Sequence, residues 1–415
     1  MRLNGIFKDN MVFQRNAQIR VFGVADANAV SVLARIMDGD KILSEGIADY
    51  IEEDGRSFVI ELDALPAGGP YTLWVDSQVN EITIHNVYIG EVWLAGGQSN
   101  MEYPLGRSAN AASVVASCPK TNIHFYNVPV FDKVNEELIE AEAETKWDLI
   151  DSDTCYGMSG IGFFFAMKVQ EYLKANGEDL HFGVIGCYLG GSSVSCWQSV
   201  ETLGKTEEGR RYLDEFKSKC DAWGSREEYL EAEASYLDEC ETFESKVNEV
   251  LKKDPYITYF DVEKITGPGA WPPPVGLLSV RRPGSLFDGM LMRIVPFALR
   301  GVIFYQGEED TIAHSADYAV VFRTMIEQWR ALFRNEDMPF LFCQLPVFPP
   351  EGDPEEELWA VVREQQRIVA DTVANTYMAE IMDCGEIGNV HPSDKKTPGE
   401  RLAAFAVKDV YGLDY

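Results

Sequence analysis

The hydrophobic pattern of the chain changes character close to residue 88. Before that point, short apolar runs are separated by clusters of turn-forming residues, which is typical of short β-strands. Strands are predicted at Ile19–Val24, Val30–Ile36, Phe58–Leu62, Tyr71–Val75 and Ile82–Val87. Because short strands at regular spacing favour a sandwich, residues 1–88 are predicted to form a small N-terminal β-sandwich domain.

Beyond residue 88, apolar runs of strand length alternate with longer segments of helical periodicity. Strands are predicted at Val92–Ala95, Phe182–Ile185, Gly301–Tyr305, Phe340–Leu345 and Tyr377–Met382. Helices are predicted at Met158–Asn176, Met290–Leu299, Asp317–Phe333, Leu358–Ala374 and Arg401–Val410. This alternation predicts an α/β domain over residues 89–415, in which helices cover both faces of a parallel sheet in three layers.

One stretch, at about residues 200–275, interrupts the alternation. Arg226–Lys253 is rich in charge but carries an apolar stripe, which indicates an amphipathic helix or helical hairpin. The following Pro268–Pro274 contains too many prolines for a regular element. We interpret residues 200–275 as an insertion into the α/β domain, located beside the rim of the active site that the strand ends are expected to form.

A serine stands at the most informative strand end. The apolar run Val92–Ala95 leads into Gly96 and Gly97, and Ser99 follows at the turn before an expected helix. Glycines permit a tight turn that leaves the next side chain exposed, so Ser99 is a candidate nucleophile. An ordinary capped turn is the alternative interpretation.

Three further polar stretches follow hydrophobic runs: Cys187–Ser192, Tyr305–Glu308 and Asn389–Pro392. Taken in order with the block Gly-Gln-Ser-Asn-Met and with His-Pro-x-x-Lys, they resemble the SGNH hydrolase superfamily, and most closely its sialate O-acetylesterase group of carbohydrate esterases. The resemblance covers nearly the whole chain. It implies a flavodoxin-like three-layer α/β/α hydrolase domain behind a small N-terminal β-domain.

The resemblance also implies an activity and a catalytic pair. The expected enzyme is a serine esterase that removes O-acetyl groups from sialic acid or from plant-type oligosaccharides through an acetyl-enzyme intermediate. Ser99 is the expected nucleophile and His391 the expected base, with His314 as the runner-up. Because ligands in parallel sheets bind at the carboxyl ends of the strands, these residues are expected to converge there.

The remaining roles are those of the oxyanion donors and of the aromatic side chains near the site. The oxyanion is expected to accept hydrogen bonds from the Ser99 N–H, from a backbone N–H in Gly190-Gly191, with Gly191 favoured, and from the Gln306 amide. Trp197 either forms a wall of the sugar site or packs in the core. Trp271, in the insertion, either stacks on a sugar or packs locally.

The acid that orients His391 is the weakest point of the resemblance. The positions three and two residues before His391, where relatives carry Asp, are Gly388 and Asn389. Glu308 is the first choice, and Glu386 and Asp383 are second choices. A dyad, with the histidine oriented by a backbone carbonyl or by Asn389, is the remaining alternative.

Composition narrows the class of partner and the compartment. The chain has 36 Lys and Arg against 67 Asp and Glu, a formal net charge of −31, which argues against nucleic acid and anionic membranes as partners. The N-terminus shows no signal-peptide pattern and the eight cysteines show no metal spacing, so a cytoplasmic protein with reduced thiols and no metal or cofactor is expected. The oligomeric state is open.

Two other functions are weighed against the acetylesterase. A lipid esterase or thioesterase on the same scaffold would need an apolar groove for a long acyl chain. A non-catalytic carbohydrate-binding protein is favoured only by the missing carboxylate near His391.

Overall fold

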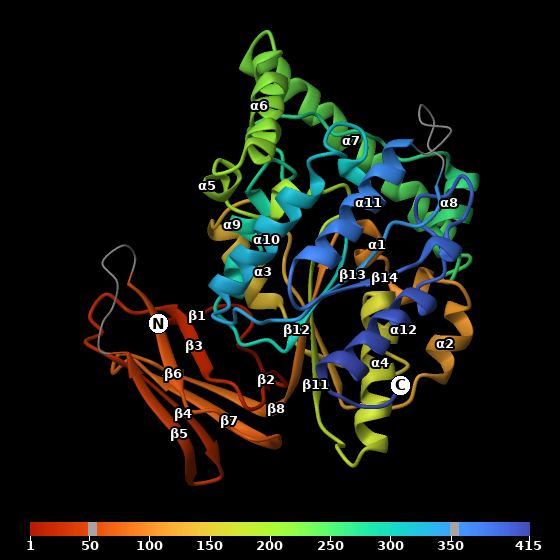
Figure 1. Ribbon diagram of the computed structural model, residues 1–415. Coiled ribbons are helices and arrows are strands. Elements are labelled where there is room, and N and C mark those ends of the chain that lie inside the picture. The colour runs from red at the N-terminus through yellow and green to blue at the C-terminus, as the bar shows by residue number, and fades with distance from the viewer. Residues whose placement is uncertain (49–55, 349–356) are drawn as a thin grey trace.

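The chain folds into a mixed α/β structure, shown in Figure 1 as a computed structural model that describes residues 1–48, 56–348 and 357–415. Part of the N-terminal region forms a small sheet in the order β1-β3-β6. Its strands are β1 (Arg2–Leu3), β3 (Ile19–Val24) and β6 (Ser57–Leu62). The other N-terminal strands are β2 (Val12–Gln14), β4 (Val32–Asp38), β5 (Lys41–Ala48) and β7 (Gly68–Asp76).

The second sheet is larger and runs β10-β9-β11-β8-β12-β13-β14, with β7, β4 and β5 continuing from one end of β8. The bounds are β8 (Glu81–Gly97), β9 (Ile123–Asn127), β10 (Asp148–Leu149), β11 (Phe182–Tyr188), β12 (Gly301–Tyr305), β13 (Phe340–Cys343) and β14 (Thr376–Ala379). Neighbours from β9 to β14 pair in parallel, whereas β10 pairs antiparallel with β9. The carboxyl ends of the parallel strands therefore share one edge.

β8 connects the two parts of the molecule. Its first half pairs antiparallel with β7, and its second half pairs in parallel with β11 and β12. From Ile89 to Gly97 nearly every residue is buried, which explains the unbroken apolar run in this part of the sequence. The boundary predicted at residue 88 lies inside this strand, and the division into domains at that point stays a prediction.

Helices cover both faces of the parallel sheet. The longer ones are α4 (Gly160–Ala175), α6 (Glu207–Asp221), α7 (Arg226–Leu251), α10 (Tyr318–Leu332), α11 (Glu357–Thr372) and α12 (Lys396–Phe405). The shorter ones are α1 (Ser99–Glu102), α2 (Ala111–Ser117), α3 (Glu136–Glu144), α5 (Val200–Leu203), α8 (Tyr259–Thr266) and α9 (Ser285–Gly289). None of the helices in the described part of the chain has the length and apolar character needed to cross a membrane.

Contacts between aromatic rings show which face of the parallel sheet each helix covers. Trp93 of β8 packs against Phe165 of α4 with ring centroids 5.0 Å apart. Phe304 of β12, which pairs with Gly96, stacks on Phe322 of α10 at 5.4 Å. Because residues 93 and 96 point to opposite faces of a strand, α4 and α10 lie on opposite faces. Figure 1 shows α4 with α12 on one side of the strands and α10 on the other.

Most predicted elements are confirmed, and one is wrong. In place of the expected helix at Met290–Leu299 the structure has a single 3₁₀ turn at Leu291–Arg293, which follows the short helix α9. Pro296 lies in the middle of the expected segment, and a proline there has no N–H to donate to the preceding turn. The insertion is helical as expected, and α6 and α7 project together from one end of the molecule (Figure 1).

A buried carboxylate on β8 ties the central strand to both flanks. Glu91, whose side chain is fully buried, accepts hydrogen bonds from Arg15 at 2.5 Å and from Arg300 at 2.8 Å. Gln14 and Tyr411 donate to the same carboxylate, each at 3.1 Å. The network therefore joins β2, the start of β12 and the C-terminal segment.

We expect Glu91→Leu to lower the free energy of unfolding by about 3 kcal/mol, because it leaves two guanidinium groups without their shared anion. Glu178→Ala is the matched control: Glu178 also pairs with Arg15 but its side chain is 43% exposed, so its loss should cost less than about 1 kcal/mol. Urea unfolding of both variants measures the difference, and equal losses would contradict the assignment.

Candidate active site

Ser99 and His391 meet at the carboxyl edge of the sheet. Ser99 is the first residue of α1, directly after β8, and His391 lies in the loop between β14 and α12. The Nε2 atom of His391 lies 2.8 Å from the Oγ atom of Ser99, although 292 positions separate them in the chain. This is the contact that a base needs to take the proton of a nucleophilic hydroxyl.

A small cavity opens beside the Ser99 hydroxyl. Its volume is about 130 Å³, and it is lined by Ser99, Glu102, Tyr103, Tyr259, Glu263 and His391. The rings of Tyr103 and Tyr259 meet edge to face, with centroids 4.8 Å apart. The cavity is therefore narrow and partly aromatic, with room for a small acyl group.

The side chain of Asn100 holds the histidine loop against α1. Its amide nitrogen donates to Glu308 Oε1 at 2.6 Å and to the carbonyl of Val390 at 3.0 Å. Its oxygen accepts a hydrogen bond from the Lys395 ammonium at 2.6 Å. Since Val390 directly precedes His391, these bonds position the backbone that carries the imidazole.

The expectation that Glu308 orients the imidazole directly is not met. Glu308 is buried, and its hydrogen-bonding partner is the Asn100 amide rather than His391. Burial raises the pKa of the Glu308 carboxyl to about 7, and the bond from Asn100 opposes this shift. Its second oxygen, Oε2, is buried and has no partner among the described residues.

The second choices do not contact the imidazole either. Glu386 accepts from the Asn389 amide at 2.8 Å and from the backbone N–H of Ser393 at 2.7 Å, whereas Asp383 pairs with Arg401 at 2.6 Å. Asn389 itself accepts from the backbone N–H of His391 at 3.0 Å. Across residues 1–48, 56–348 and 357–415, no carboxylate or carbonyl hydrogen bonds to Nδ1 of His391, which leaves a Ser–His dyad.

The surroundings of His391 favour its neutral form. Burial lowers the pKa of its imidazole to about 4, and the nearby Lys395 ammonium adds to the shift. Burial likewise lowers the pKa of Lys395 itself, to about 7. Only a neutral imidazole can accept the serine proton, so the site is prepared for general-base catalysis at neutral pH.

Two backbone N–H groups near the Ser99 hydroxyl are free to bind an oxyanion. Neither the N–H of Ser99 nor that of Gly191 has a hydrogen-bonding partner among the described residues. In contrast, the N–H of Gly190 donates to Glu102 Oε2 at 2.7 Å. Of the two glycines, Gly191 is therefore the one whose backbone N–H is free to donate, and its role as an oxyanion donor stays a prediction.

The prediction that Gln306 donates to the oxyanion is wrong in this structure. The Gln306 side chain is 1% exposed, and its amide nitrogen donates to Asp310, to the carbonyl of Ser192 at 3.1 Å and to Gln98 at 3.2 Å. These acceptors use the capacity of the amide group. Gln306 holds the Ser192 loop against β8 instead of facing the cavity.

The same correction applies to Trp197 as a wall of the site. Its side chain is fully buried, and its indole N–H donates to Ser192 Oγ at 2.9 Å. The core-packing alternative therefore holds. The exposed aromatic beside the strand ends is Trp271, which is 54% exposed and lies against Gly191.

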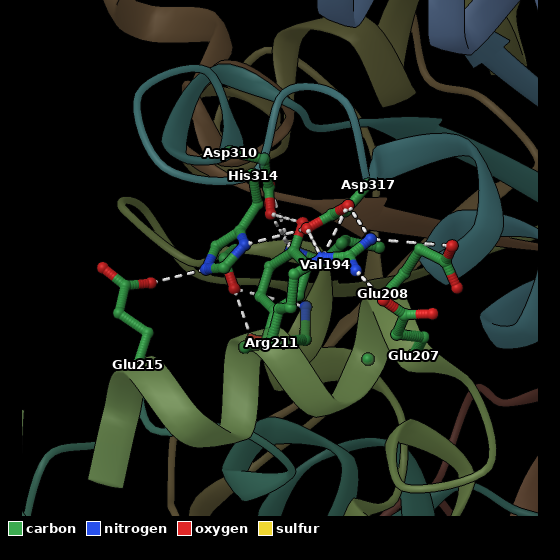
Figure 2. A network of polar contacts seen from close by, with 12 residues as sticks. Val194, Glu207, Glu208, Arg211, Glu215, Asp310, His314 and Asp317 are labelled. Carbon is green, nitrogen blue, oxygen red and sulfur yellow. Dashed lines mark hydrogen bonds and ion pairs between the residues drawn. The ribbon is translucent and has the colours of Figure 1, made fainter. Parts of the chain in front are cut away.

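His314 belongs to a separate polar network at the base of the insertion. Figure 2 shows its ring between Glu215 of α6 and Asp317, and it also stacks on Tyr212 at 3.7 Å. Tyr212 donates to Asp310 at 2.8 Å, which in turn binds the Gln306 amide. His314 is thus not a base for Ser99, although its network supports the loop behind Gln306.

The sequence did not point to Glu102, Tyr103, Tyr259 or Glu263, which line the cavity. Glu102 could have been found, because a residue three positions after Ser99 lies on the same face of a helix. Tyr259 and Glu263 come from α8 in the insertion. No spacing rule links that helix to the strand ends.

Comparisons with known proteins confirm the resemblance to sialate O-acetylesterases. Residues 277–408 match the family model described as carbohydrate esterase, sialic acid-specific acetylesterase. The chain is 24% identical to the sialate O-acetylesterase of Mus musculus over 431 residues, which cover 97% of this chain and 72% of the mouse protein. It is 22% identical to the sialate O-acetylesterase of Homo sapiens, over 99% of this chain and 71% of the human protein.

A solved structure has the same overall fold. The crystal structure of a carbohydrate acetylesterase from Xanthomonas citri superposes with a TM-score of 0.71 at 25% sequence identity, and the match covers 99% of this chain and 75% of that chain. The mixed α/β architecture with one large sheet is therefore shared with carbohydrate esterases.

The rate at which a fluorophosphonate labels Ser99 should rise with pH through a pKa near 4, well below the ordinary histidine value of 6.5. The reason is that the reaction needs neutral His391, which burial and Lys395 favour. Lys395→Met should move the limb to higher pH, because it removes the positive charge. Labelling measured between pH 3.5 and 8, with circular dichroism to confirm folding, tests this; a wild-type limb at 6.5 or above would contradict it.

Proposed function

We propose that the chain is a serine esterase that removes O-acetyl groups from acetylated sugars. The observation that carries the proposal is the 2.8 Å contact between Ser99 Oγ and His391 Nε2 at the edge of a parallel sheet. The similarity to sialate O-acetylesterases and to a carbohydrate acetylesterase supports ester hydrolysis on acetylated sugars. O-acetylated sialic acids and O-acetylated plant-type oligosaccharides both carry the acetyl ester that this reaction removes.

The reaction follows from the positions of the groups. The Ser99 oxygen attacks the acetyl carbonyl carbon while His391 takes the hydroxyl proton. The N–H groups of Ser99 and Gly191 bind the oxyanion that forms. His391 then gives its proton to the departing sugar oxygen, leaving an acetyl group on Ser99. A water molecule, deprotonated by His391, attacks this acetyl-enzyme; as the bond to Ser99 breaks, His391 returns the proton to the Ser99 oxygen and acetate is released.

The catalytic pair works as a dyad in this mechanism. In serine hydrolases the third residue holds the imidazole in the productive tautomer, and its loss costs about 10⁴-fold in kcat. Here the bonds from Asn100 to Val390 and from His391 to Asn389 fix the loop backbone instead. We therefore infer that backbone anchoring replaces the missing carboxylate in part.

We assign the fold to the SGNH hydrolases, with an N-terminal β-sandwich. With the edge strands β9 and β10 left aside, the order β11-β8-β12-β13-β14 corresponds to chain positions 2-1-3-4-5, the order of flavodoxin-like sheets. The sandwich is supported by the sheet β1-β3-β6 and by the separate pairing of β4, β5 and β7. The eight cysteines are free; the reducing compartment and the cytoplasmic location stay predictions.

Ser99→Ala should abolish release of acetate from acetylated sugars and from nitrophenyl acetate, with a loss of at least about 10³-fold, because no other group takes the place of the nucleophile. Ser117→Ala, at an exposed serine of α2, is the matched control. Retention of activity in Ser99→Ala with an unchanged fold would remove the proposal. Turnover by the wild type would exclude the non-catalytic binding protein.

The size of the cavity opposes the lipid esterase alternative. Because the cavity, which Tyr103 and Tyr259 help to line, has a volume of only about 130 Å³, we expect kcat/KM for nitrophenyl esters to fall steeply from acetate to butyrate and octanoate. Tyr259→Ala should widen the cavity and flatten the profile. A wild type that prefers octanoate would favour the lipid esterase instead.

A further inference from the structure

Arg281 grips the loop that carries the proposed oxyanion donor. Its Nε atom donates to the carbonyl oxygen of Gly190 at 2.7 Å. The two terminal NH₂ groups of its guanidinium form no hydrogen bond or ion pair with any described residue. The neighbouring Arg282 differs in this respect, because its guanidinium is held by Asp132 at 2.7 Å.

Trp271 lies beside this guanidinium and against the same loop. The Arg281 guanidinium carbon is 5.6 Å from the centroid of the indole ring, within the range of a cation–π contact. A Cβ on Gly191 would overlap the far edge of the Trp271 ring, and Gly191 has a φ of +67°. Only glycine therefore lets the indole approach the loop this closely, while 54% of Trp271 stays exposed.

The pair contacts the loop that packs on Ser99. A Cβ on Gly190 would lie 3.2 Å from the Cβ of Ser99, so this loop packs directly on the catalytic serine. Arg281 and Trp271 thus approach Ser99 from the Gly190–Gly191 side. Tyr259 and Glu263 of α8 approach it from the cavity side.

Arg281 supplies the positive charge at this rim. The cavity is lined by the carboxyls of Glu102 and Glu263, whose pKa burial raises, and by no lysine or arginine among the described residues, so it offers no cation to an anionic group of a substrate. Glu102 also reaches the Gly190 side, where it accepts a hydrogen bond from the Gly190 N–H, and it interacts electrostatically with Arg281, as Glu309 does. A planar guanidinium with two free NH₂ groups offers the fork that binds a carboxylate with two parallel hydrogen bonds.

We propose that Arg281 and Trp271 form a subsite for an acidic sugar, in which the Arg281 fork binds the sugar carboxylate and the indole packs on the apolar side of the sugar. This inference rests on the proposed function and names the substrate class of that site: a sialic acid, whose carboxylate and acetylated side chain lie at opposite ends of the molecule. The carboxylate then reaches Arg281 while the acetyl group enters the cavity at Ser99.

The test compares two sugars that differ only in charge: 9-O-acetyl-N-acetylneuraminic acid and its C1 amide. For the wild type, kcat/KM should favour the acid by about 10–100-fold, the range for hydrogen bonds to a charged group. Arg281→Gln should bring this ratio close to one, and Arg281→Lys should restore part of it. Arg282→Gln, at the paired arginine, should leave the ratio unchanged.

Nitrophenyl acetate separates this inference from the proposed function. If the wild type hydrolyses neither nitrophenyl acetate nor either sugar, the esterase proposal fails and the subsite fails with it. If the esters are hydrolysed but the wild type does not discriminate the acid from the amide, or Arg281→Gln lowers both equally, the carboxylate subsite is wrong and the esterase stands. Trp271→Leu should lower kcat/KM for both sugars at least about tenfold more than it lowers kcat/KM for nitrophenyl acetate; equal effects on all three would assign the indole to loop support alone.

Discussion

The site depends on one buried amide. The Asn100 side chain uses its hydrogen-bonding groups on three partners: the Glu308 carboxyl, the Val390 carbonyl and the Lys395 ammonium. Through these bonds α1, which carries Ser99, is joined to the end of β12 and to the loop that carries His391. A buried group with unmet partners is costly, so this arrangement tolerates few alternatives. The hydrogen bonds of Asn100 thereby hold the two segments that carry Ser99 and His391 at the distance that gives the 2.8 Å contact.

The helices and strands and their order could be predicted because buried segments are apolar, and their apolar residues recur with the period of a strand or a helix. Short unbroken apolar runs such as Gly301–Tyr305, set between segments of helical periodicity, are typical of strands that are covered on both faces. The helix expected at Met290–Leu299 does not form, because Pro296 interrupts a segment whose apolar pattern is otherwise helical. That β8 continues from one sheet into the other could not be predicted, since pairing partners lie far away in the chain.

The site shows a sharper limit. Because ligands bind at the carboxyl ends of parallel strands, the sequence predicted that Ser99, Gly191, Gln306 and His391 lie at one edge of the sheet, and the structure has them there. It could not say where each side chain points. Gln306 turns toward Asp310, and Trp197 lies in the core, because these side chains fill space and satisfy polar groups next to them. Glu308 reaches the histidine loop only through Asn100, an arrangement in which no motif spacing shows the intermediary.

The groups proposed to react with the ester and the residues proposed to select the substrate come from different parts of the chain. The sheet edge supplies Ser99, Gly191 and His391, and their positions follow from strands that are buried on both faces. The insertion supplies α8 and the proline-rich segment that carries Trp271, and these contribute walls rather than reacting atoms. A loop or insertion on a rigid scaffold can change without disturbing the core. The leaving sugar and the acyl group would therefore be chosen by the insertion together with Arg281, which follows it in the chain, while Ser99 and His391 stay the same.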